Sequence, residues 1–267
     1  MEKYTKIEFV NLSEQEKEIL IALLSEKGFD GFEERENDLD AFIPAENYND
    51  DTLDGIGFPF AKSNIEPENW NEVWESNFHP VIVDDFVAVR ADFHPPVNNI
   101  RFDIVITPKM SFGTGHHATT HLMMQQMREI DFTGKTVFDF GTGTGILAIL
   151  ADKLNASMIN AIDNDEWSIN NATENIQQNN CNNISLRLSD KPSTGQQFDI
   201  ILANITKNII LENFSVLSRQ LNKNGILLLS GLLEGDEEEI LNEGKKHLLT
   251  PGLRLKERNW LCMRFLR

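Results

Sequence analysis

The chain has 267 residues, 40% of them hydrophobic and 25% charged, and it carries a formal net charge of −18. This composition is typical of a globular protein and excludes disordered and collagen-like chains, and the length favours one large domain together with a smaller one. The negative charge disfavours unaided binding to nucleic acid, and the sequence has no run of about 20 apolar residues that could span a membrane.

The first 60 residues predict a small acidic α+β domain. They hold 16 Asp and Glu against 5 Lys and Arg, a net charge of −11, which favours solubility and also suits a basic protein partner. Residues 1–10 lack the apolar segment of a signal peptide, so a cytoplasmic location is expected. The elements predicted are a strand at Tyr4–Val10, a helix that begins with a capping box at Ser13 and Glu16 and ends at Gly28, and a hairpin with strands at 31–35 and 39–43.

Residues 61–80 predict a linker that contains a helix. Pro67 suits the first turn of such a helix, and Trp70 and Trp74 lie four residues apart on one helical face. An aromatic pair of this kind is more typical of packing than of ligand binding.

Residues 81–267 predict an α/β domain in which strands and helices alternate. Short β-like runs at 81–83, 87–90 and 104–106 and a helix at 117–130 precede strands at 136–140, 158–162, 184–188, 199–203 and 226–230. Helices are expected at 146–154, 165–179, 207–221 and 236–248, and a terminal hairpin at 253–258 and 260–266. The five strands and the hairpin together predict a doubly wound, mainly parallel sheet of seven strands.

The strongest local signal is a strand that leads into three closely spaced glycines, Gly141, Gly143 and Gly145. Glycines allow the backbone to turn tightly and to approach a ligand. Ile146 follows the third glycine, so the spacing differs from the G-x-G-x-x-G of dinucleotide folds, and no P-loop is present. Asp163 ends the next strand, where a carboxylate can bind both hydroxyls of a ribose or can cap a helix. Together these features favour S-adenosylmethionine (SAM) over NAD.

Residues 112–120 have the sequence F-G-T-G-H-H-A-T-T and open the helix that precedes the glycine-rich strand. The glycines suit a loop that folds over a ligand. The side chains of the adjacent His116 and His117 diverge, and no further metal ligands accompany them. Cys181 and Cys262 are too few for a disulfide framework or a cysteine-rich metal site. No metal is therefore expected.

Asn204 follows a buried strand, at the edge where open α/β sheets bind ligands. The residues after it are Ile205, Thr206 and Lys207, so the chain lacks the Asn-Pro-Pro-Tyr loop used on planar amide and nucleobase nitrogens. This points towards aliphatic amines as substrates. An alternative role for Asn204 is to cap the following helix.

Residues 112–120, 139–145 and 203–205 resemble the methyltransferase family of large-subunit ribosomal protein eleven. The similarity covers nearly the whole chain, including N-W-N-E-V-W at 69–74 and F-H-P at 78–80. It implies a class I SAM-dependent methyltransferase with a Rossmann-like fold. Such an enzyme would trimethylate lysine side chains and the N-terminal amine of that ribosomal protein, and it would release S-adenosylhomocysteine. One departure is Thr206, which follows Ile205 where the family often has leucine.

The resemblance also assigns roles to parts of the chain. Residues 1–60 are expected to recognise the ribosomal protein, 61–80 to form the linker and 81–267 to form the catalytic domain. The protein is expected to be a monomer that contacts neither nucleic acid nor membrane. The residues expected to bind SAM are Thr120, Gly141, Asp163 and Asn204, which match the family by position, together with Gly143 and Gly145 of the glycine loop.

Methyl transfer from a sulfonium requires a neutral amine in line with the methyl carbon. The pKa of lysine is about 10.4, so burial or a proton acceptor must help to remove its proton. Asn204 is expected to orient the incoming nitrogen. His116 or His117 is a hypothetical proton relay, and replacing each with Gln tests this role because unchanged turnover would exclude it.

Three alternatives share the predicted fold. One is an NAD-dependent oxidoreductase, which binding of NADH would reveal. Another is a SAM-dependent RNA methyltransferase, which the charge and the missing Asn-Pro-Pro-Tyr loop disfavour. The third is a SAM-binding module without activity.

Overall fold

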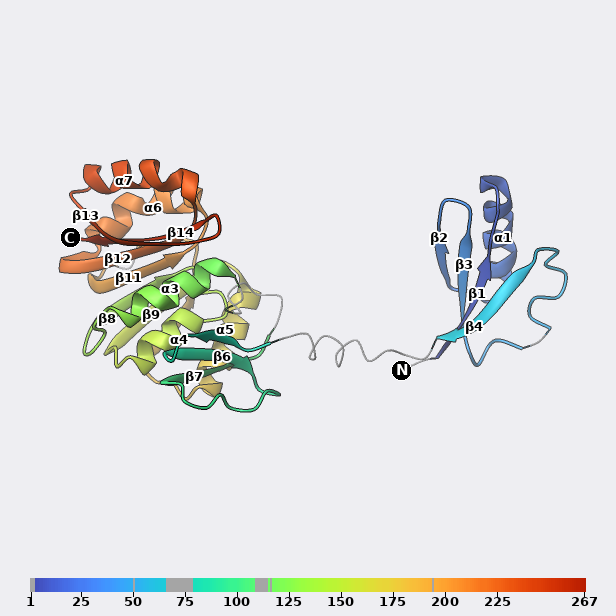
Figure 1. Ribbon diagram of the computed structural model, residues 1–267, viewed down its shortest axis with the longest axis horizontal. Coiled ribbons are helices and arrows are strands. Elements are labelled where there is room, and N and C mark those ends of the chain that lie inside the picture. Colours follow the sequence, from blue (N-terminus) through green and yellow to red (C-terminus); the bar gives the residue numbers. More distant parts are fainter. Residues whose placement is uncertain (1–2, 50, 66–78, 109–114, 116, 194) are drawn as a thin grey trace. The chain divides into compact units, whose positions relative to one another are not determined.

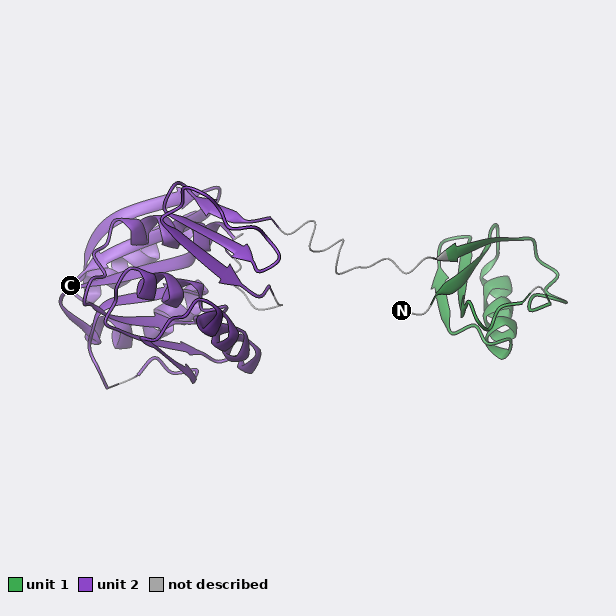
Figure 2. Ribbon diagram, turned by 90° about the horizontal axis from the view of Figure 1, so that it is seen from below, with its two compact units in different colours: residues 1–77 green, residues 78–267 purple. Residues whose placement is uncertain are grey.

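The computed structural model describes residues 3–49, 51–65, 79–108, 115, 117–193 and 195–267. The chain forms two compact units, Met1–Asn77 and Phe78–Arg267 (Figure 2). The predicted linker helix with Trp70 and Trp74, and His116 of the second motif, lie outside the described residues.

The first unit is a four-stranded antiparallel sheet with helix α1 (Glu14–Glu26) on one face (Figure 1). The strand order is β2-β3-β1-β4, with β1 at Tyr4–Phe9, β2 at Gly31–Glu34, β3 at Leu39–Pro44 and β4 at Phe60–Ile65. The predicted capping box is present, because the Ser13 N–H donates to Glu16 Oε2 at 2.8 Å and the Glu16 N–H donates to Ser13 Oγ at 3.4 Å. Apolar residues of β1, β3 and α1 form the core of this unit.

The sheet of the first unit continues past residue 60, where the sequence predicted the end of the domain. β4 pairs with β1 from Phe60 to Ile65, and the compact unit includes this strand. Residues 61–64 are exposed. An edge strand with exposed polar side chains lacks the alternation of buried and exposed residues on which a prediction depends, so the boundary was placed too early.

The second unit contains the predicted seven-stranded sheet, and its α/β class is confirmed. The strand order is β10-β9-β8-β11-β12-β14-β13. The parallel strands are β8 (Thr136–Phe140), β9 (Met158–Asp163), β10 (Ile184–Leu188), β11 (Phe198–Asn204) and β12 (Leu221–Leu233), and the antiparallel strands are β13 (Thr250–Glu257) and β14 (Trp260–Leu266). The strand order reverses between β8 and β11, which is where such sheets bind ligands.

Helices cover both faces of this sheet (Figure 1). The helices α3 (Ala118–Arg128), α4 (Ile146–Lys153) and α5 (Glu166–Gln178) share one buried cluster with Val137 of β8. The helices α6 (Lys207–Arg219) and α7 (Glu237–Lys246) share a second cluster with Phe138, the next residue of β8. Successive residues of the central strand therefore face opposite cores, which explains why this strand is apolar throughout.

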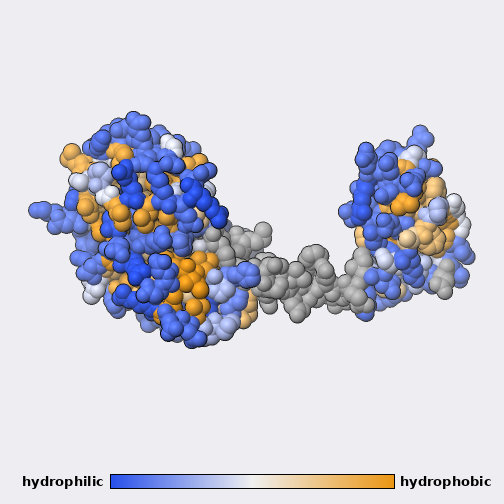
Figure 3. Space-filling model, in the orientation of Figure 1, coloured by the Kyte–Doolittle hydropathy of each residue, from blue (hydrophilic) through white to orange (hydrophobic). Residues whose placement is uncertain are grey.

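The β-like runs predicted before α3 form a separate three-stranded sheet, of order β5-β6-β7. Its strands are Val81–Val83, Val87–Ala91 and Phe102–Ile106, and their buried residues join the cluster of α3, α4 and α5. No helix within the described ranges is long and apolar enough to cross a bilayer. The faces of both units seen in Figure 3 are mainly hydrophilic.

Candidate functional site

The carboxyl ends of the parallel strands meet at one edge of the seven-stranded sheet. Phe140 of β8 lies opposite Ile162 of β9 and Ala203 of β11, and Asn204 lies opposite Ser230 of β12. A cavity of about 770 Å³ opens at this edge. Its lining includes Gly141, Gly143, Asp163 and Asn204, so four of the six residues predicted to bind SAM share one cavity.

The glycine loop turns in a conformation that side chains rarely adopt. Gly141, Gly143 and Gly145 have φ values of +78°, +55° and +81°. A Cβ atom on Gly141 would lie 2.3 Å from Cγ2 of Ile205, so the loop also passes close to the chain after β11. Gly145 begins α4 and packs against Ala172 of α5, and it is absent from the cavity lining. The loop therefore presents Gly141 and Gly143 to a ligand.

Asp163 is fixed by two backbone amides. Its Oδ2 accepts a hydrogen bond from the Gly143 N–H at 2.8 Å, and its Oδ1 accepts one from the Asp165 N–H at 3.0 Å. The cap of α5 is Asp165, whose side chain accepts from the N–H groups of Trp167 and Ser168. The capping alternative for Asp163 is therefore excluded, and its carboxylate lines the cavity beside the glycine loop.

Asn204 is buried at the end of β11, with 8% of its surface exposed. Its Nδ2 donates a hydrogen bond to Thr120 Oγ1 at 3.2 Å, whereas its Oδ1 has no hydrogen-bond partner within the described part of the chain. The residue at the cap position of α6 is Thr206, so Asn204 does not cap that helix. Thr120, which was predicted to contact SAM, is fully buried next to Asn204 and does not line the cavity.

His117 lines the cavity and also caps α3. Its Nδ1 accepts a hydrogen bond from the Thr119 N–H at 3.3 Å and lies 2.8 Å from Thr119 Oγ1. The ring meets Trp260 edge-on, with 4.6 Å between ring centroids, and Trp260 is a further wall of the cavity. In the described ranges, no group of three His, Cys, Asp or Glu side chains is placed to hold a metal ion.

The sequence did not single out several residues of this site. Ser189, Asp190 and Lys191 line the cavity directly after β10, at a strand end that the predicted element boundaries already gave. Gly231 and Trp260 come from β12 and from the terminal hairpin. These two positions depend on how distant strands pair, so no local pattern indicates them.

Asp139 is a buried carboxylic acid beneath the glycine loop, and the sequence analysis assigned it no role. It is fully buried in β8, and its Oδ2 accepts a hydrogen bond from Thr142 Oγ1 at 2.6 Å. Burial is the main cause that raises the pKa of Asp139 to about 7, and the negative charge of Asp163 adds to this, while the bond from Thr142 opposes it. The folded protein therefore holds a proton on Asp139 at pH values where an exposed Asp has lost its own.

This burial predicts a pH dependence of stability. The pKa of Asp139 is raised from 3.8 to about 7 on folding, so its contribution is fully present below pH 3.8 and is lost as the pH rises through 7. We expect the free energy of unfolding to fall by about 3 kcal/mol between pH 5 and pH 8 because of Asp139. Urea unfolding at pH 5 and pH 8 would measure the fall, and Asp139→Asn should reduce it. An equal fall in the variant would contradict the prediction.

Comparisons with known proteins agree on one family. The family profile described as "Ribosomal protein L11 methyltransferase (PrmA)" matches residues 6–267. A protein of Porphyromonas gingivalis named ribosomal protein L11 methyltransferase is 42% identical over 265 residues, which cover 93% of this chain and 90% of the relative. A protein of Bacteroides fragilis with the same name is 36% identical, with 95% of each chain covered.

Solved structures give the same result for the fold. The crystal structure of a ribosomal protein L11 methylase from Lactobacillus delbrueckii subsp. bulgaricus has a TM-score of 0.66 and 28% identity, and the alignment covers 70% of this chain and 98% of that one. A T. thermophilus 16S rRNA N2 G1207 methyltransferase, solved with AdoMet and guanosine, has a TM-score of 0.51 at 18% identity and covers 59% of this chain and 45% of its own. The second similarity concerns the fold alone.

Proposed function

The chain belongs to the ribosomal protein L11 methyltransferase family, and we propose on this basis that it transfers methyl groups from SAM to ribosomal protein L11. The observation that carries the proposal is the convergence of the glycine loop, Asp163 and Asn204 on one cavity. Lysine side chains and the N-terminal amine are the proposed acceptors, with trimethylation as the end point.

The residues of the cavity fit SAM. Asp163 presents a fixed carboxylate that can accept hydrogen bonds from ribose hydroxyls, and the exposed backbone at Gly141 and Gly143 allows a close approach that a side chain would block. When bound, SAM supplies a methyl group on a positively charged sulfur. The loop 141–145 contains no lysine or arginine that could bind a phosphate, which suits a cofactor without phosphate groups.

Asn204 is the proposed orienting residue for the amine. Its Nδ2 is held by Thr120, which fixes the rotation of the carboxamide and leaves the acceptor Oδ1 for a substrate N–H. A neutral amine held in this way would keep its lone pair directed at the methyl group that bound SAM would supply. Each of the first two transfers would leave a protonated amine that must lose a proton before the next one, whereas the trimethylated nitrogen keeps its positive charge.

His117 is proposed as the proton acceptor, either directly or through water. It lies on the same cavity as Asn204, and its Nδ1, which accepts from the Thr119 N–H in the cap of α3, would have to leave that bond to accept a proton. The corresponding proposal for His116 rests on sequence alone, because that residue lies outside the described ranges. The Gln variants of both histidines remain the test.

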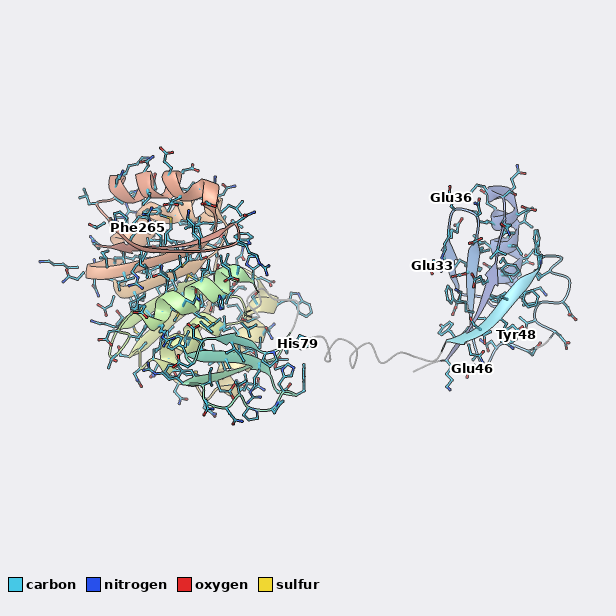
Figure 4. The ribbon with its side chains drawn as sticks, in the orientation of Figure 1. Glu33, Glu36, Glu46, Tyr48, His79 and Phe265 are labelled. Carbon is cyan, nitrogen blue, oxygen red and sulfur yellow. The ribbon has the colours of Figure 1, made fainter. Side chains whose placement is uncertain are left out.

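The first unit is proposed to bind the basic substrate protein. Glu33 of β2 and Glu36 of the following turn are exposed, and Figure 4 shows their side chains on the surface of the hairpin. Residues 1–60 carry a net charge of −11, which attracts a basic partner and repels nucleic acid. We propose that the enzyme acts as a monomer in the cytoplasm and without direct contact with RNA.

The decisive experiment is transfer of labelled methyl from SAM to purified ribosomal proteins and, separately, to ribosomal RNA. We expect label in one small basic ribosomal protein, and we expect Asp163→Ala to weaken SAM binding by about 30- to 100-fold, because charge-assisted hydrogen bonds to the ribose are lost. Asp165→Asn is the matched control, since it removes a neighbouring charge but keeps a residue that can cap α5. Label in RNA but not in protein would favour the RNA methyltransferase alternative.

A further inference from the structure

Helix α5 and its C-cap residue carry a row of three asparagines on the face that meets β7. Asn171, Asn175 and Asn179 follow each other at intervals of four residues, and at most 9% of each is exposed. β7 pairs with β6 on one side, and its other side receives these carboxamides. A carboxamide has both donors and an acceptor, so it can satisfy the backbone groups at the edge of a strand.

The hydrogen bonds of the row are specific. Asn179 accepts from the Val105 N–H at 3.0 Å and donates to the Val105 carbonyl at 2.6 Å. Asn175 accepts from the Thr107 N–H at 2.8 Å, and Asn171 donates to the Thr107 carbonyl at 3.0 Å. The three side chains therefore cover the end of β7 in the way that a neighbouring strand would.

Asn175 differs from the other two because its bonds join two parts of the fold. Its Nδ2 donates to the carbonyl of Thr144 at 2.8 Å, and Thr144 lies between Gly143 and Gly145 in the glycine loop. Asn179 instead donates its remaining bond to the Asn175 carbonyl, within α5 itself. Ala172 of α5 also meets the loop, at Gly145. The glycine loop thus rests on α5, and through Asn175 it is tied to β7.

We propose that Asn175 is a positioning residue for the cofactor loop, which sets SAM affinity through the carbonyl of Thr144 without touching the cofactor. The inference rests on the proposed SAM site. The loop turns at three glycines, which have wide conformational freedom, so a buried hydrogen bond from α5 restricts the conformations that it samples. By linkage, SAM binding also stabilises the contact between Asn175 and β7.

The test compares matched variants in the full-length protein. Asn175→Leu removes the side-chain bonds to both Thr107 and Thr144 at similar volume. Asn175→Asp keeps an acceptor for the Thr107 N–H but loses the donor to the Thr144 carbonyl. Asn179→Leu removes only the bonds to β7 and to the Asn175 carbonyl. We expect both Asn175 variants to raise the Kd and KM for SAM by about fivefold, with kcat at saturating SAM unchanged. Asn179→Leu should lower the unfolding midpoint but leave the SAM Kd unchanged.

A second measurement needs no variant. Amide hydrogen exchange in the wild-type protein should slow at Thr107 when SAM is added, although Thr107 is absent from the cavity lining, and it should slow less at Val105. Any of three results would overturn the inference. They are a SAM Kd for Asn175→Asp within about twofold of the wild-type value, an equal loss of SAM affinity in Asn179→Leu, and unchanged amide exchange at Thr107. Failure of the wild-type protein to bind SAM at all would instead overturn the proposed function on which it rests.

Discussion

Replacement of Gly231 by Ala is expected to lower the free energy of unfolding of the second unit by about 4 kcal/mol and to abolish SAM binding at ordinary concentrations. Gly231 has φ +83° and lies in β12 where the pairing with β14 shifts register. A Cβ atom there would lie 2.0 Å from the carbonyl oxygen of Ile205 and 2.7 Å from its carbonyl carbon. Since the obstacle is backbone, no side-chain rotation relieves it.

The effect reaches the site because Ile205 follows Asn204. The Ile205 N–H donates to the Ser230 carbonyl at 3.2 Å, so the backbone segments that contain Asn204 and Gly231 are hydrogen-bonded to each other. Moving the Ile205 backbone away from a new methyl group displaces both Asn204 and the contact of Ile205 with the glycine loop. Gly235→Ala is the control, because its added Cβ would meet no atom within 4 Å. Urea unfolding and SAM titration give the measurement, and a loss of less than about 1 kcal/mol in Gly231→Ala would contradict it.

Much of this fold was predictable from periodicity. β8 is mainly apolar and leads into glycines, and β10 alternates apolar and polar residues, so both strands were predicted with the bounds that the structure shows. The glycine loop and the strand-end position of Asp163 and Asn204 followed from the same pattern, because a parallel sheet brings all its carboxyl ends to one edge. Those side chains therefore meet in one cavity although they are far apart in the sequence.

The remainder depended on tertiary pairing. Trp260 reaches the cavity only because β14 inserts antiparallel between β12 and β13. Asp139 lies inside an apolar strand, where its burial and its bond from Thr142 become visible only when the loop is folded over it. Thr120 matched the family's SAM contacts by position, yet it is fully buried, accepts a hydrogen bond from Asn204 and does not line the cavity.

Asn204→Ala is expected to lower kcat by about a thousandfold, equivalent to about 4 kcal/mol of transition-state stabilisation, while SAM affinity falls much less. The reason is that alanine removes the Oδ1 of Asn204, which has no hydrogen-bond partner within the described residues and which we propose accepts from the substrate amine. Loss of orientation acts on the transition state more than on cofactor binding. Single-turnover methylation with SAM in excess would measure the change.

Thr120 supplies the graded control for this role. Thr120→Val removes the oxygen that accepts from Asn204 Nδ2, so the carboxamide keeps its acceptor but loses its fixed rotation, whereas Thr120→Ser retains the oxygen. If Asn204 orients the amine, Thr120→Val should lower kcat by about tenfold and Thr120→Ser should not. If Asn204 were only a cofactor contact, Asn204→Ala would raise the Kd for SAM and leave kcat at saturation unchanged. The separation of kcat from Kd therefore decides whether the buried Oδ1 of Asn204 serves the substrate amine or the cofactor.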